Sequence, residues 1–178
     1  MAMTRPLTGE PLGVDLLNTT WRSGTGPVDV LDDIAGTRDW LLEAGIAGPT
    51  TEAVREALIR ARAAIRAHAE APDSEPAISA LNEVLRWGRS WPAVSATGPM
   101  VERAVEDPAR WAGWLAAVDY AEQVAARPGR IRSCAHPDCV LWFVDTSARG
   151  TRRWCSMAGC GNRAKAARHY ARSRPGDE

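Results

Sequence analysis

The four cysteines of this 178-residue chain are the residues whose types and spacing most clearly suggest chemistry. Cys134 and Cys139 form one pair, and Cys155 and Cys160 form a second, with four residues inside each pair and fifteen between the pairs. Each pair encloses a Gly, Pro or Asp suited to a tight turn. Two such turns can bring four thiolates to the corners of a tetrahedron, the geometry that Zn²⁺ prefers. Because four protein ligands leave no position for water, we predict one structural Zn²⁺ per chain.

Two disulfides, or four unrelated buried thiols, are the alternatives for these cysteines. Disulfides persist in oxidising compartments. The first residues, MAMTRPLTGEPLGVDLL, lack the charged segment and following apolar segment of an export signal. No apolar run approaches the roughly 20 residues that a membrane helix needs. The sequence therefore favours zinc over disulfides and predicts a cytoplasmic protein.

The residues around the cysteines also carry a family resemblance. Cys160-Gly161-Asn162-Arg163, with FVDTS (143–147) and RRWCSM (152–157) before it, resembles the CGNR zinc finger. Upstream, LGVDLLNT (12–19) and DWLL (39–42) resemble the ABATE-type domain that precedes this finger in its family. That family is regarded as stress-induced transcription regulators, so the resemblance implies a helical first domain and a DNA-binding finger.

The net charge of zero conceals a strong asymmetry along the chain. Residues 1–126 carry 11 basic and 18 acidic side chains, whereas residues 127–174 carry 11 basic and 2 acidic ones. A basic module on an acidic body is typical of a module that binds a polyanion. Mutual attraction between the two halves is the alternative explanation.

Periodicity predicts a mainly α protein with the domain order 1–126 helical domain, 127–130 hinge and 131–174 finger. Helices are expected at 37–44, 51–70, 74–87 and 107–126, with a short hairpin at 90–103. The arginines of the helix at 51–70 are expected on its solvated surface. A short stretch holding Asp15, Asn18, Trp21 and Arg22 could line a small-molecule pocket, or these residues could cap and buttress the first helix.

The order of elements predicted for the finger is that of a treble clef. A strand at 140–144 would pair with a second strand at 151–154, and a helix would follow from about residue 161. On that helix Lys165, Arg168 and Arg172 share one side. The residues Ala164, Ala167, Tyr170 and Ala171 are expected to face the hairpin and the metal.

The basic side of this helix, joined by arginines of the preceding turn and strand, is the candidate nucleic-acid surface. A solvated helix end is the alternative. Asn162 and Arg163 are expected to brace the finger. The predicted nucleic-acid contacts are Arg149, Arg152, Arg153, Lys165, Arg168 and Arg172.

Three classes of function fit these observations. The first is a zinc-dependent DNA-binding transcription regulator whose helical domain senses a small-molecule ligand or forms a homodimer. The second is a small-molecule enzyme or ligand-binding protein in which the finger is structural, although no set of catalytic residues stands out. The third is a protein–protein adaptor.

Overall fold

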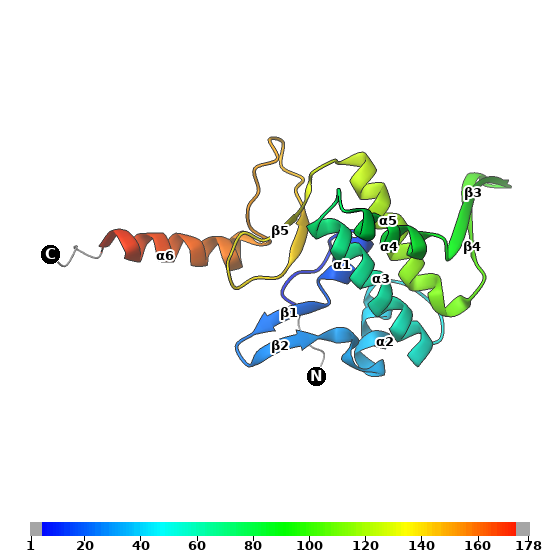
Figure 1. Ribbon diagram of the computed structural model, residues 1–178, viewed down its shortest axis with the longest axis horizontal. Coiled ribbons are helices and arrows are strands. Elements are labelled where there is room, and N and C mark those ends of the chain that lie inside the picture. Colours follow the sequence, from blue (N-terminus) through cyan, green and yellow to red (C-terminus); the bar gives the residue numbers. More distant parts are fainter. Residues whose placement is uncertain (1–4, 174–178) are drawn as a thin grey trace.

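The computed structural model describes residues 5–173, with side chains described up to Ala167 and at Tyr170 (Figure 1). Six helices lie in this part of the chain: α1 Leu12–Leu17, α2 Ile34–Glu43, α3 Glu52–Glu70, α4 Glu75–Leu85, α5 Trp111–Ala126 and α6 Asn162–Ser173. The strands form three antiparallel hairpins: β1 Thr20–Ser23 with β2 Gly26–Asp29, β3 Gly88–Ser95 with β4 Gly98–Val105, and β5 Ile131–Ser133 with β6 Trp142–Val144. The mainly α fold expected from the sequence is confirmed.

The helices begin where side chains can cap them. Thr51 accepts a hydrogen bond from the amide of Val54 at the start of α3, whose apolar stripe is buried as expected. Asp33 caps α2 by accepting from the amide of Gly36, so this helix begins at Ile34 and not at Thr37. The sequence-based boundary of α2 was wrong because an aspartate N-cap four residues before Thr37 offers an earlier start.

Helices α1, α3 and α5 enclose the core of the body. Gly13 of α1 lies so close to α5 that an added Cβ would be 2.5 Å from the carbonyl oxygen of Ala116. A side chain at this position would therefore push the two helices apart. Trp40, Trp114 and Tyr120 are almost completely buried in this core. The close contact at Gly13 holds α1 against α5 and thereby positions the residues that follow α1.

The finger differs from the predicted hairpin in its strand pairing. Strand β6 pairs with β5, and residues 151–154 form no strand. Their backbone is used elsewhere: the carbonyl of Arg153 accepts from the amide of Ala135, and the amide of Arg152 donates to Asp145. The prediction of a second strand at 151–154 was therefore wrong, because these residues bind the first cysteine turn and Asp145.

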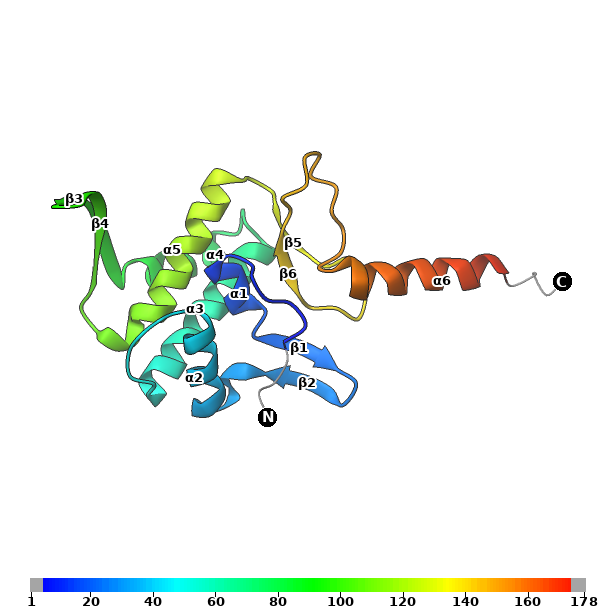
Figure 2. The same cartoon turned by 180° about the vertical axis from the view of Figure 1, so that it is seen from behind.

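The finger and the body share one hydrophobic core. Trp142, Phe143 and Val144 of β6 are buried, and they belong to the same apolar cluster as the helices of the body. Strand β6 packs against α1, and both views show the β5–β6 hairpin beside that helix (Figure 1, Figure 2). The segment expected as a hinge is bonded to the finger, since the carbonyl of Arg130 accepts from the amide of Asp145. The division into domains at 127–130 stays a prediction about the chain.

Two elements project from opposite ends of the molecule. Helix α6 extends away from the body at one end, and the β3–β4 hairpin projects at the other (Figure 2). The hairpin confirms the one expected around residues 90–103. Within the part of the chain that the structure describes, no helix is both long enough and apolar enough to span a bilayer.

Candidate metal centre and nucleic-acid interface

The sulfur atoms of Cys134, Cys139, Cys155 and Cys160 form one cluster, all within 4.8 Å of one another. The Sγ atoms of Cys139 and Cys155 are 3.8 Å apart, and those of Cys155 and Cys160 are 3.6 Å apart. A tetrahedral zinc with bonds of about 2.3 Å requires sulfur–sulfur distances of about 3.8 Å. The cluster therefore has the spacing of a four-cysteine zinc site and can hold one Zn²⁺.

Local structure positions both cysteine pairs. Cys134 directly follows β5, and a turn closed by the amide of Cys139 and the carbonyl of His136 brings Cys139 back beside it. Cys155 and Cys160 flank a tight turn that leads directly into α6. Ser156 starts this turn by accepting from the amide of Gly159. The metal site thus joins the β5–β6 hairpin to the root of α6.

Hydrogen bonds shape the electrostatics of the sulfur cluster. The pKa of Cys139 is lowered to about 5, chiefly by a hydrogen bond from the Cys155 thiol, and the pKa of Cys155 is raised by the same interaction. The amide of Cys155 donates to the sulfur of Cys134 at 3.4 Å. Four thiols this close compete for protons, and a divalent cation removes that competition by stabilising all four as thiolates.

Arg163 contacts the sulfur cluster directly. Its Nη2 donates to the sulfur of Cys160 at 3.1 Å, and this hydrogen bond raises the pKa of the guanidinium. A cation at this place offsets part of the negative charge that four thiolates leave on a zinc centre. Asn162 is exposed and its side-chain amide donates to the carbonyl of Ala158, within the turn that carries Cys160. The role of Asn162 and Arg163 in bracing the finger stays a prediction, which these two contacts favour.

Arg152 lies inside the finger. Its guanidinium donates to the carbonyl oxygens of Val144, Trp154 and Cys155, and it lies 4.3 Å from the centroid of the Phe143 ring. These contacts engage all three nitrogens of the guanidinium and three of its five N–H donors. The structure therefore places the Arg152 guanidinium against the backbone of the finger, and its contact with nucleic acid stays a prediction.

Asp145 is the central residue of the loop after β6, a role that the sequence analysis missed. It is almost fully buried and accepts hydrogen bonds from the amide and hydroxyl of Ser147 and from the amide of Arg152. The hydroxyl of Ser147 is the main reason that its pKa is lowered. Arg130 and Arg132 lie within 4.0 Å of its carboxylate. The sequence signal was the Asp-Thr-Ser order, which is typical of a turn closed by an aspartate side chain.

The remaining predicted nucleic-acid contacts are exposed where the structure describes them. Arg149 lies on the loop after β6, Arg153 lies beside Trp154, and Lys165 lies on the first turn of α6. The side chains of Arg168 and Arg172 lie outside the described residues. Ala167 is exposed and the side chain of Tyr170 is 73% exposed. The expectation that these two residues pack on the metal core was wrong, because α6 leaves the body after its first turn.

The four residues that were predicted to line a pocket lie in different parts of the structure. Asp15 is buried, pairs with Arg5 through both carboxylate oxygens and accepts from the indole of Trp40. Asn18 is fully buried and bonds to both the amide and the carbonyl of Trp142, at 2.8 and 2.9 Å. These partners satisfy both groups and join α1 to the finger.

Trp21 and Arg22 face a different region. Trp21 is buried under the finger, and Arg22 is exposed on β1. Together they line a cavity of about 250 Å³ with the cysteine turns and Arg163. A ligand in a pocket formed by all four predicted residues stays a prediction, and the structure brings only two of them to one cavity.

The arginines of α3 overturn one expectation. Arg62 is buried and pairs with Asp29 through both oxygens, each at 2.6 Å, and also donates to Thr19. Arg66 donates to the carbonyl of Leu17 and the hydroxyl of Thr20, and burial lowers its pKa. These side chains are not a solvated face, because the β1–β2 hairpin folds over them. Long-range packing of this kind leaves no local signal in the sequence.

Two family models match the chain. The model of the CGNR zinc finger matches residues 130–173, and the model described as "Putative stress-induced transcription regulator", the ABATE family, matches residues 10–127. The second match covers more than half of the chain, so the protein belongs to this family. The comparison with curated proteins finds no match. The order of the two matches is the order expected from the sequence.

Proposed function

We propose that this member of the ABATE family is a transcription regulator that binds duplex DNA through the outer part of its zinc finger. The observation that carries the proposal is that Arg149, Arg153 and Lys165 are exposed on the finger. Basic side chains outnumber acidic ones in this part of the chain, whereas the body is acidic. Helix α6 projects from the body with no other element beside it over most of its length (Figure 1). An α-helix fits the major groove, where arginine can contact guanine through two hydrogen bonds.

The metal centre has a defined part in this mechanism. When bound, Zn²⁺ would cross-link the two cysteine turns, the second of which runs into the first turn of α6. Arg163 and Asn162 hold that turn, and the buried β6 strand anchors the turn to the body. The direction of α6 is therefore set by the body through the finger, so DNA would meet a helix whose root is fixed.

We further propose that the protein acts in the cytoplasm and binds its operator as a homodimer. A single finger covers little DNA, and regulators commonly gain affinity by placing two modules on neighbouring half-sites. A small-molecule ligand that regulates binding fits the same scheme.

A salt titration of binding to random duplex DNA tests the proposal. We expect the full-length protein to bind at low salt with a steep dependence on salt concentration. Changing Lys165, Arg168 and Arg172 together to Ala should reduce the slope of log K against log salt by about 3, since each lost phosphate contact removes about 0.9.

The matched control removes the same charge at the opposite end of the molecule. Arg86, Arg89 and Arg103 are exposed on or beside the β3–β4 hairpin, and their joint replacement by Ala should leave the slope unchanged. Equal loss in both triple variants would mean that only net charge matters. Absence of binding by the wild-type protein at low salt would overturn the proposed function.

A further inference from the structure

Three adjoining hollows follow the boundary between the body and the finger. They enclose about 630, 480 and 250 Å³. Arg66 and Val140 line both the first and the second hollow, and Trp21, Arg22 and Val140 line both the second and the third. Neighbouring hollows therefore share walls, and we call this line of hollows the seam.

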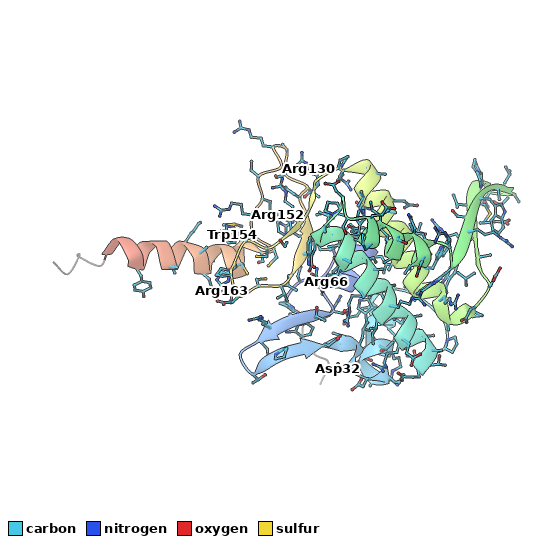
Figure 3. The ribbon with its side chains drawn as sticks, in the orientation of Figure 1. Asp32, Arg66, Arg130, Arg152, Trp154 and Arg163 are labelled. Carbon is cyan, nitrogen blue, oxygen red and sulfur yellow. The ribbon has the colours of Figure 1, made fainter. Side chains whose placement is uncertain are left out.

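Each hollow of the seam is lined by arginine. Arg66 and Arg132 line the first, Arg22 and Arg66 the second, and Arg22 and Arg163 the third. Arg22 and Arg66 come from the body, whereas Arg132 and Arg163 come from the finger. Figure 3 shows Arg66 between the two parts of the molecule and Arg163 at the root of α6. A row of guanidinium groups contributed by both domains is a surface that complements a chain of negative charges.

Two of these guanidinium groups, those of Arg66 and Arg22, form no ion pair with a carboxylate in the described part of the chain, so their positive charge is open to another partner. Arg66 donates to a carbonyl and a hydroxyl. Arg22 has no carboxylate partner among the residues that the structure describes, and it is exposed. Its backbone is nevertheless fixed, because the preceding Trp21 is buried and strand β1 is paired with β2 along its whole length.

The acidic residues of the seam do not cancel this charge. Asp29 is neutralised by Arg62, which holds both of its oxygens. Asp138 points to solvent with its side chain 77% exposed, and Asp32 (labelled in Figure 3) is also exposed where it lines the second hollow. Glu70 lies at the other end, near Arg66 in the largest hollow. The stretch between Arg22 and Arg163 is thus the most basic part of the seam.

We propose that the seam binds the phosphodiester backbone of the duplex that α6 contacts, with Arg22 as the outermost contact from the body. This inference rests on the proposed function. Arg163 belongs to the first turn of α6, so a duplex lying along that helix passes the end of the seam. A planar guanidinium can hold two phosphate oxygens at once, which a lysine cannot do with the same geometry. The body would then fix the register of the duplex while α6 enters the groove.

The test compares salt titrations of duplex binding for four full-length proteins: wild type, Arg22→Ala, Arg22→Lys and Arg103→Ala. We expect Arg22→Ala to lower the slope by about 0.9 and to raise the Kd roughly fivefold near 0.1 M salt. Arg22→Lys should keep the slope, and Arg103→Ala, an exposed arginine of the opposite hairpin, should match wild type. Thermal unfolding of each variant checks that the fold is kept.

The outcomes separate the two proposals. If wild type binds and Arg22→Ala shows the wild-type slope, the seam does not contact the backbone and the proposed function stands. If wild type does not bind, both fall. If a free nucleoside monophosphate at millimolar concentration protects wild type but not Arg22→Ala against thermal unfolding, while the slopes are equal, the seam binds small phosphate compounds and the backbone contact is refuted.

Discussion

The zinc finger has an inner half, which packs around the sulfur cluster and against the body, and an outer half, which faces solvent. Arginine has different surroundings in the two halves. In the inner half, Arg130, Arg152 and Arg163 each have protein partners: backbone carbonyls, a carboxylate or a cysteine sulfur. In the outer half, Arg149 and Arg153 are exposed, and α6 continues into solvent. The inner arginines contact groups of the finger itself, and the outer ones face solvent. Composition alone does not distinguish the two sets of arginines, because both halves are positively charged.

A second contrast concerns the way the finger joins the body. The outer half makes few contacts, whereas β6 is part of the common core and its backbone is held by Asn18 and Glu10. Burial at this contact raises the pKa of Glu10. A finger anchored in this way is a continuation of the body, and metal binding is expected to stabilise both.

Replacing a metal ligand should have the largest effect on the stability of the finger. We expect Cys155→Ser to abolish zinc binding and to unfold the cysteine turns, since structural zinc contributes on the order of 10 kcal/mol to such modules. Zinc content by atomic absorption and thermal unfolding by circular dichroism check this. Retention of one zinc per chain with an unchanged Tm would contradict the assignment of Cys155 as a ligand.

A smaller effect is expected from the contact between α1 and β6. Asn18→Ala removes two buried hydrogen bonds and leaves the amide and carbonyl of Trp142 without partners, so unfolding should become easier by about 3 kcal/mol. Urea denaturation measures this change. Asn82→Ala, an exposed residue of α4, is the control and should change the free energy of unfolding by less than about 0.5 kcal/mol. Equal effects would show that Asn18 does not join the two parts.

The smallest effects distinguish two neighbouring arginines. Arg152→Ala should destabilise the protein by about 2 kcal/mol, because three backbone carbonyls lose a charged donor. Arg153→Ala should leave stability within about 0.5 kcal/mol of wild type, and it should weaken DNA binding. Denaturation and salt titration of both variants provide the measurement. A reversal of the two patterns would remove the distinction between the inner and outer halves.

The sequence predicted those features that depend on local patterns. The equal spacing of the cysteines predicted the metal site. Apolar periodicity predicted the boundaries of α3, α4 and α5 to within a few residues. Pairing partners far apart in the chain could not be predicted. Nothing near Trp142 indicates that β6 pairs with residues 131–133, or that Asn18 binds its backbone from 124 residues away.

The roles of individual arginines could not be predicted from the sequence for the same reason. Arg62 looks like a surface residue because its neighbours on α3 are polar, and only the fold brings Asp29 and Thr19 to it. Arg152 and Arg153 are adjacent and identical in type, yet one lies over Phe143 inside the finger and the other is exposed. Arg22 was predicted as a pocket residue, and the structure places it on the seam.

The most direct test of the shared core is hydrogen exchange on the full-length protein before and after zinc is removed with a chelator. The structure predicts that amides of β6 and of α1 lose protection together, because Asn18 and the buried side chains of β6 connect them. Amides of α4, which packs mainly on α3 and α5, should keep more of their protection. Loss of protection confined to residues 131–173, with α1 unchanged, would show that the finger folds independently of the body and would contradict this account.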